Sequence, residues 1–180
     1  PIEYVSDLAI IGIYYFKSGE NLEKELQHLI DNDIKDKGEY QLTDALENMK
    51  NKGLSFTTGE VDEWLDCGNK DATVYTCERV LDHNKNLNLI DNDAEILETE
   101  IIEPCYIGPG VIIQNSIIGP NVSIGSGTKI LNSKIEDSII QENTNIDNAK
   151  LAKSMIGNNV YYNGKNTPQE VSIGDFCEIK

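Results

Sequence analysis

Aliphatic residues recur at a fixed interval along the second half of the chain. The first column of such residues advances in steps of 17, 16, 16 and 17 and contains Ile107, Ile124, Ile140, Ile156 and Ile173. Two more columns follow a similar interval; one contains Ile113, Ile130, Ile146 and Tyr162, and the other contains Ile102, Ile118, Ile135 and Leu151. Three interleaved columns indicate three short strands in each coil of a solenoid. The pattern predicts a parallel β-helix of triangular section over residues 101–180, with one column lining each inner wall.

Residues 1–85 follow a different pattern, which is typical of mixed α/β structure. A near-continuous apolar run over 8–16 predicts a strand that is covered on both faces. Apolar residues at helical spacing predict a helix after Ser18, and Thr43 is placed to cap a second helix. A third helix is predicted over 69–81.

Two shorter apolar stretches, 54–58 and 60–65, predict further strands in this half. A polar stretch rich in Asn and Asp follows the third helix and is typical of a linker. The expected domains are therefore residues 1–85, a linker over 86–100, and the β-helix over 101–180.

The charge of the chain limits its expected partners. Lysine and arginine total 15 against 31 acidic residues, which gives a formal net charge of -16. Such an excess repels phosphate backbones and anionic lipid surfaces, so neither nucleic acid nor a membrane is an expected partner. No apolar run approaches the roughly 20 residues needed to span a bilayer. The four cysteines form no CxxC pair, as expected for the reduced thiols of a cytoplasmic protein.

Two short motifs carry candidate chemistry. In the run 64–68, Trp-Leu-Asp-Cys-Gly, the carboxylate of Asp66 would stand at the C-terminal edge of a strand, where ligands collect in open α/β sheets. A carboxylate there can hold Mg²⁺ together with substrate phosphates; the alternative is a simple turn residue. In the run 37–44 a loop carries Lys37 and Glu39 into a helix start, and the alternative is a capped helix with an incidental ion pair.

These runs, taken in order, resemble a known family. The segments 8–16, 37–46 and 64–68, followed by the repeats over 101–180, are similar to the sugar-binding half and the C-terminal left-handed β-helix of sugar-1-phosphate nucleotidyltransferases. The resemblance is closest to the long form of glucose-1-phosphate thymidylyltransferase and its uridylyltransferase relatives. It implies that residues 1–85 are the second half of a Rossmann-like catalytic domain.

The resemblance assigns substrate-binding roles to particular residues. Ile10 and Tyr14 match positions that line the sugar pocket, and Trp64 would wall the same site. Glu39 matches a carboxylate that forms hydrogen bonds with sugar hydroxyls. Lys37 falls where the thymidylyltransferases have an arginine that contacts phosphate.

The resemblance also implies a metal and a reaction. Asp66 matches an aspartate that ligates Mg²⁺. An oxygen of a sugar-1-phosphate, glucose-1-phosphate in the nearest relatives, would attack the α-phosphorus of dTTP or UTP and release pyrophosphate. The phosphate is itself the nucleophile, so no general base from the protein is required.

The family's nucleotide loop has no counterpart in this sequence. That loop is rich in glycine and contains arginine, whereas Arg79 is the one arginine of the chain and no Gly-x-Gly-Thr-Arg segment occurs. In the family a Glu-Lys-Pro triplet precedes the strand that resembles 8–16, and Pro1 matches its proline. We therefore expect the chain to be the C-terminal part of a longer enzyme and to be inactive alone.

Two other functions stay open. Hexapeptide β-helices also form acyltransferases, which resemble one another in using a histidine as general base, and residues 101–180 contain no histidine. The second alternative is a non-catalytic module for oligomerisation or regulation. A homo-oligomer is expected because several apolar residues beside the columns would point outward. These residues are Val111, Ile117, Ile139, Met155 and Tyr161.

Overall fold

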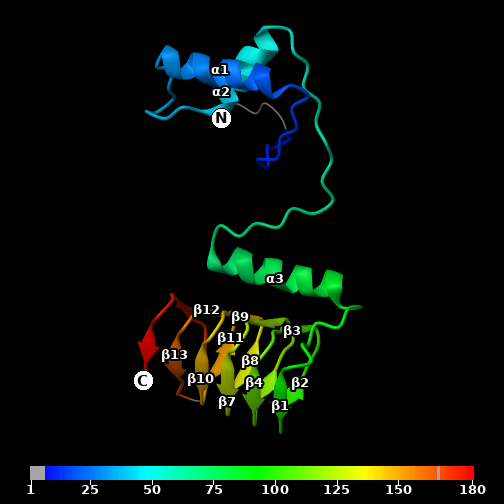
Figure 1. Cartoon of the computed structure of the whole chain (residues 1–180), viewed down its shortest axis with the longest axis vertical. Helices are drawn as coiled ribbons and strands as arrows, with labels where there is room; N and C mark the ends of the chain where they lie inside the picture. Colours follow the sequence, from blue (N-terminus) through cyan, green and yellow to red (C-terminus); the bar gives the residue numbers. More distant parts are fainter. Residues whose placement is uncertain (1–6, 166) are drawn as a thin grey trace. The chain divides into compact units, whose positions relative to one another are not determined.

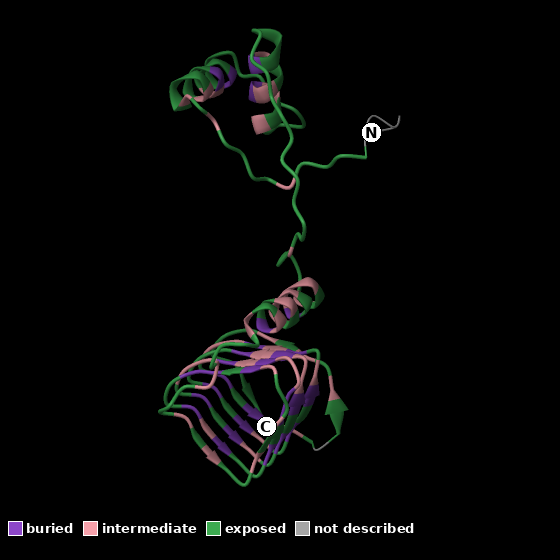
Figure 2. Cartoon of the chain, turned by 90° about the vertical axis from the view of Figure 1, so that its right-hand side faces the viewer, coloured by how far each residue is buried: buried purple, intermediate pink, exposed green. Residues whose placement is uncertain are grey.

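The computed structural model describes residues 7–165 and 167–180 and divides into two compact units, residues 1–64 and 65–180 (Figure 1). Buried side chains lie in both units, most of them inside the solenoid of the second (Figure 2). Of the helices within the described ranges, none is both long and apolar enough to cross a bilayer.

Two helices form the folded part of the first unit. Helix α1 (Gly19–Asp31) follows Ser18, as predicted. Helix α2 (Leu42–Asn51) forms where the second helix is expected, with Gln41 rather than Thr43 at its N-cap position. The helices pack against each other, and the buried apolar residues are Leu29, Ala45 and Met49.

The strands predicted in this unit are wrong. The apolar run 8–16 is irregular backbone, and so are the two shorter runs before residue 66. Ile13 and Tyr15 have exposed fractions of 80% and 87%. A strand needs hydrogen-bonded neighbours, and among the described residues of this unit the only β pairing is a single bridge between Asp36 and Glu39. The described residues of this unit therefore form no sheet of the Rossmann type.

The second unit contains a parallel β-helix built from three sheets. The first sheet contains β1 (Glu95–Leu97), β4 (Ile112–Gln114), β7 (Lys129–Leu131), β10 (Asn145–Asp147), β13 (Tyr161–Asn163) and β16 (Glu178–Ile179). The second sheet contains β2 (Glu100–Ile101), β5 (Ile117–Ile118), β8 (Lys134–Glu136), β11 (Lys150–Ala152) and β14 (Pro168–Gln169). The third sheet contains β3 (Cys105–Ile107), β6 (Val122–Ile124), β9 (Ser138–Ile140), β12 (Met155–Ile156) and β15 (Ser172–Ile173).

The aliphatic columns line the interior of the solenoid, which confirms the predicted β-helix. Ile107 pairs with Ile124 in the third sheet, and both side chains are fully buried. Ile113 pairs with Ile130 in the first sheet, and both are again fully buried. Each fully buried aliphatic side chain stabilises the folded chain by about 1.5–3 kcal/mol, so the columns supply most of the hydrophobic core.

Two details of the first coil differ from the prediction. The column of the second sheet begins at Ile101, which pairs with Ile118, whereas Ile102 is 39% exposed. The step is thus 17 residues rather than 16, and a slip of one residue turns a side chain to the other face of a strand. The expected linker 86–100 is partly β structure, because β1 lies within it and Ile90 forms a bridge to β3.

Helix α3 (Lys70–Asn84) packs on the third sheet of the β-helix, against β6 and β9 (Figure 1). Asn69 caps this helix, because its side chain accepts a hydrogen bond from the backbone N–H of Ala72 at 2.9 Å. The packing of α3 on the solenoid explains why the boundary between the units lies after residue 64 and not after residue 85.

The apolar residues predicted to face outward fall into three groups. Val111 is fully buried; it lies two residues before Ile113 and so shares the inward face of that column residue. Ile139 and Met155 are half-buried on the third sheet, where α3 packs. Ile117 and Tyr161 are exposed, by 36% and 42%. The apolar outer surface is therefore smaller than the sequence predicts.

The corners of the solenoid hold non-glycine residues in the left-handed region. Asn115 and Asn132 have φ values of 49° and 48°, a conformation that asparagine tolerates better than most residues. The Nδ2 group of Asn115 donates a hydrogen bond to Oδ1 of Asn132 at 2.9 Å. Beneath them, the hydroxyl of Ser116 accepts from the backbone N–H of Ser133 at 3.1 Å. Polar side chains thus link successive coils at this corner.

Candidate functional site

A tight hairpin between α1 and α2 carries two of the predicted binding residues. The backbone N–H groups of Asp36 and Glu39 each donate to the carbonyl of the other residue at 3.0 Å. Lys37 and Gly38 form the two-residue loop, and both have positive φ values, 51° and 86°. This is the geometry of a type I′ turn. The turn brings Lys37 and Glu39 together as an exposed cation and an exposed carboxylate.

Neighbouring side chains brace this hairpin. The Tyr40 hydroxyl donates to Oδ1 of Asp33 at 2.8 Å, and Nζ of Lys35 lies 2.5 Å from the same oxygen. The Lys35 ammonium also lies 4.8 Å from the centre of the Tyr40 ring. Hydrogen bonds from Lys35 and Tyr40 lower the pKa of Asp33 and keep it ionised near neutral pH. The exposed turn therefore stands on an ordered base.

An ion pair joins the two helices that flank the hairpin. Nζ of Lys52 donates to Oε1 of Glu25 at 2.6 Å, and Glu25 is 7% exposed. The second carboxylate oxygen, Oε2, has no hydrogen-bond partner among the described residues. A buried carboxylate with one oxygen unpaired is costly, and the pair with Lys52 offsets part of that cost.

The remaining predicted sugar contacts lie in irregular segments of the same unit. Ile10 is 66% exposed, Tyr14 is 37% exposed and stacks on Phe16 with ring centres 6.3 Å apart, and Trp64 is 62% exposed. A cavity of about 420 Å³ in this unit includes none of the predicted binding residues. Its lining is aromatic and polar: Tyr15, Phe16, Lys17, Ser18, Asn21, Met49, Leu54, Ser55, Phe56 and Thr57. The sequence analysis missed this cavity because its lining comes from runs assigned to strands.

Asp66 lies in a turn that leads into α3. Its Oδ1 atom accepts a hydrogen bond from the backbone N–H of Gly68 at 3.2 Å, and its carbonyl accepts from the Thr76 hydroxyl at 2.7 Å. The side chain is exposed. No group of three or more His, Cys, Asp or Glu side chains within the described ranges is placed to hold a metal ion. The geometry corresponds to the turn-residue alternative, and it leaves one carboxylate oxygen as a possible single donor to a metal.

Lys70 fixes the start of α3 to the solenoid. Its ammonium donates to Oε1 of Glu170 and, at 2.9 Å, to the carbonyl of Lys153, and it lies 2.8 Å from Oδ1 of Asp71. These hydrogen bonds, chiefly the one with Asp71, raise the pKa of Lys70. A groove of about 630 Å³ runs beside this contact and is lined by Asp71, Val74, Tyr75, Glu78, Asp137, Lys153 and Glu170.

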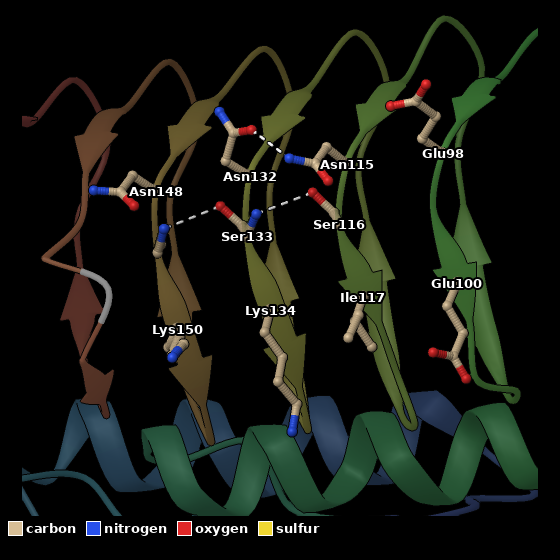
Figure 3. Close-up of a pocket in the computed structure, with 11 residues that line it drawn as sticks. Glu98, Glu100, Asn115, Ser116, Ile117, Asn132, Ser133, Lys134, Asn148 and Lys150 are labelled. Carbon is tan, nitrogen blue, oxygen red and sulfur yellow. Dashed lines mark hydrogen bonds between the residues drawn. The ribbon is translucent and has the colours of Figure 1, made fainter.

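A shallow trough of about 490 Å³ lies on the outer face of the second sheet (Figure 3). Glu98 and Glu100 lie on the first coil of this trough, and Lys134 and Lys150 lie on the third and fourth (Figure 3). The other lining residues are Asn115, Ser116, Ile117, Asn132, Ser133, Asn148 and Ala149. The repeated asparagines at steps of 17 and 16 residues are a signal by which the sequence could have located the trough.

The trough offers little for group transfer. Its lining contains no histidine or cysteine. The Ser116 and Ser133 hydroxyls are engaged, because they donate to the carbonyls of Gln114 and Leu131 at 2.8 and 2.6 Å. No lining group is therefore placed as an activated nucleophile with a neighbouring general base.

Comparison with known proteins places the chain among sugar-nucleotide enzymes. No family model matches it. It is 31% identical, over 94% of its length, to the bifunctional protein GlmU of Clostridioides difficile (strain 630), of which it spans 39%. It is 24% identical, over 89% of its length, to a glucose-1-phosphate thymidylyltransferase of Streptomyces griseus, of which it spans 48%. A glucose-1-phosphate thymidylyltransferase of Streptomyces antibioticus is 26% identical over 86% of the chain, which spans 47% of that relative. The chain thus spans less than half the length of these relatives.

Proposed function

Because this chain is homologous over most of its length to GlmU and to glucose-1-phosphate thymidylyltransferases, we propose that it contributes the sugar-phosphate-binding part of a sugar-1-phosphate nucleotidyltransferase. The observation that carries the proposal is that the homology extends over about nine-tenths of the chain. It therefore spans helical unit and β-helix together, and a likeness of the repeats alone would not do so. On this proposal residues 1–85 belong to a Rossmann-like domain in the complete fold.

The proposed reaction forms one bond and breaks one. A phosphate oxygen of the sugar-1-phosphate attacks the α-phosphorus of dTTP or UTP, and the bond to the β-phosphate breaks to release pyrophosphate. Glu39 would accept hydrogen bonds from sugar hydroxyls, and Lys37 would place a positive charge beside the sugar phosphate. The exposed faces of Ile10, Tyr14 and Trp64 would cover the sugar ring.

Magnesium is proposed as the cofactor. Mg²⁺ usually takes one or two protein carboxylates and fills its shell with water and phosphate oxygens, so a single donor at Asp66 is compatible with it. When bound, the ion would offset the negative charge of the phosphates. Asp66→Asn keeps the turn through the amide oxygen, so the proposal expects a large loss of turnover in the active enzyme with an unchanged melting temperature. A near-normal rate would return Asp66 to a purely structural role.

A binding titration separates this proposal from a non-catalytic scaffold. Glucose-1-phosphate titrated calorimetrically into the chain should show one saturable site. Glu39→Gln and Lys37→Gln should each weaken binding about tenfold or more, because each removes a charge-assisted hydrogen bond. The matched controls Glu23→Gln and Lys24→Gln, on exposed positions of α1, should leave the affinity unchanged. The absence of a saturable site would contradict the proposal.

A turnover assay addresses the 180 residues by themselves. Since the sequence contains no Gly-x-Gly-Thr-Arg loop, we expect no pyrophosphate release from dTTP or UTP with glucose-1-phosphate. Robust turnover by the purified chain would show that the nucleotide site is built from other residues.

A further inference from the structure

The outer face of the second sheet carries an ordered column of charges. Register places Glu100, Ile117, Lys134 and Lys150 beside one another on β2, β5, β8 and β11. All four are exposed. Glu98 lies at the adjoining corner of the first coil, so that the face is acidic at one end and basic at the other (Figure 3).

These charges are little used within the chain. Within residues 7–165 and 167–180, no ion pair involves Glu98, Glu100 or Lys150. Nζ of Lys134 lies 3.4 Å from Oε2 of Glu136, and both side chains are largely exposed. An exposed pair of this kind contributes about 0–1 kcal/mol and leaves the ammonium available for a stronger partner.

The other two sheets lack such a column. On the first sheet the corresponding outward positions begin at Glu95, pass through Lys129 and Tyr161, and end at Glu178, so that face is acidic at both ends. The third sheet is the face on which α3 packs. The second sheet is therefore the face that has a separated acidic and basic end and is not covered by α3.

A column of this order is complementary to itself when one copy is turned around. Neighbouring coils lie about 4.8 Å apart, so Glu100 and Lys134 stand at equal distances on either side of Ile117. A two-fold axis through Ile117 would place Glu100 of each copy opposite Lys134 of the other, with the two isoleucines in contact at the centre. A side-by-side contact with both copies in the same direction would instead oppose Glu100 to Glu100 and Lys134 to Lys134.

We infer that the second sheet is the contact surface of an antiparallel homodimer. The partner is a second copy of this chain, seated with its acidic coil against the basic coils of the first. The contact is polar apart from Ile117, so its affinity depends on charge and falls as salt screens the pairs. This inference does not depend on the proposed enzymatic function.

Charge reversal tests the surface and its direction. The wild-type chain should sediment as a dimer at micromolar concentration in low salt and dissociate as sodium chloride is raised. Glu100→Lys and Lys134→Glu should each raise the dimer dissociation constant about tenfold or more, because each places like charges opposite one another twice per dimer. The Glu100→Lys/Lys134→Glu double variant should restore the wild-type dissociation constant, since the antiparallel pairing is then regenerated with its signs exchanged.

The control is Glu142→Lys, which makes the same change in net charge at an exposed corner between the third and first sheets. It should leave the dissociation constant unchanged, and circular dichroism should show that every variant keeps its β structure. A wild-type chain that is monomeric at these concentrations would overturn the inference. So would a dimer that is indifferent to both single reversals, or a double variant that stays as weak as either single one.

Discussion

At the corners of the β-helix, single residues decide whether the chain can turn toward the next coil. Asparagine fills several left-handed positions, where its amide also links neighbouring coils, as Asn132 does by donating to Oδ1 of Asp147 at 2.9 Å. Glycine is required where backbone approaches backbone. Gly119 has a φ of +108° and lies against the carbonyl of Ile102, while Gly174 has open space around it. The two glycines therefore have different roles in the same solenoid.

Substitution of these two glycines by alanine should have opposite outcomes. In Gly119→Ala the new Cβ would overlap the Ile102 oxygen in a backbone conformation that L-residues rarely adopt. We expect the free energy of unfolding to fall by about 2 kcal/mol or more. Gly174→Ala meets no atom within 4 Å and should change it by less than about 0.5 kcal/mol. Urea unfolding of both variants measures the difference, and equal effects would contradict the assigned role of Gly119.

The thiols give a prediction about pH. Burial, with a smaller contribution from Cys105, raises the pKa of Cys77 to about 11 from an ordinary value near 9.0. Below pH 9 the thiol is neutral in both states, but between pH 9 and 11 it ionises in the unfolded chain first. Stability from the neutral buried thiol is therefore present below about pH 9 and is lost as the pH rises toward 11.

The measurement is the melting temperature between pH 8 and pH 11. Cys77→Ser, which does not titrate in this range, should reduce the alkaline fall relative to the wild type. As a control, the exposed Cys67 and Cys177 should react with a disulfide reagent at pH 8 much faster than Cys77 and Cys105. An unchanged alkaline slope in Cys77→Ser would show that Cys77 is not responsible.

Elements of the chain were predictable to the extent that their partners lie at a fixed distance in sequence. Each strand of the solenoid pairs with strands 16 or 17 residues away, so the period alone gives two of the columns and most of the third. The run 8–16 has the residue types of a buried strand, but no strand within residues 7–64 pairs with it. Helix α3 was predicted from its own residues, whereas the surface on which it packs was not, because that contact is long-range.

The candidate site divides in the same way. Lys37 and Glu39 are brought together because they are two residues apart on one turn, which depends on local sequence only. Ile10, Tyr14 and Trp64 depend on contacts far along the chain, and their roles stay predictions. The hydrogen bond from the Gly68 N–H to Asp66 was given as an alternative by the sequence, because aspartate two residues before a glycine forms turns of this kind.

Buried hydroxyl groups between coils provide a test at the level of the strand. Oγ of Ser133 accepts from the backbone N–H of Ala149 at 3.1 Å in a buried position. Ser133→Ala leaves that N–H without its acceptor and should lower the free energy of unfolding by about 1–3 kcal/mol. The control Ser172→Ala lies at an exposed outward position of β15 and should be nearly neutral. Thermal unfolding of the two variants gives the comparison; equal stabilities would mean that the inner hydroxyl is dispensable.

The molecule as a whole consists of two units with unequal cores. Residues 1–64 bury few apolar side chains, whereas residues 65–180 bury the columns of the solenoid in one continuous cluster. Apolar burial is the main source of stability, so the two units should differ in their resistance to heat and to proteases. The expected boundary at residue 85 was misplaced because α3 contributes to the second unit.

Unfolding should therefore take place in two steps. Differential scanning calorimetry is expected to show a transition of the helical unit at lower temperature than that of the β-helix. Brief proteolysis should cut the irregular backbone between α2 and α3 and leave a resistant fragment that begins near residue 65. A single cooperative transition, with no resistant fragment, would show that the two units are thermodynamically coupled.

Pairing only between neighbouring coils restricts how the length of such a chain can change during evolution. Removing residues 125–140 would join Ile124 to Gln141 and let the next coil take the place of the one removed, with every column still in register. Loss of a single residue within a strand would instead turn the following side chains from the interior to the surface. Insertions and deletions within the solenoid are thus accepted in whole coils of 16 or 17 residues, whereas projecting corners are free to vary residue by residue.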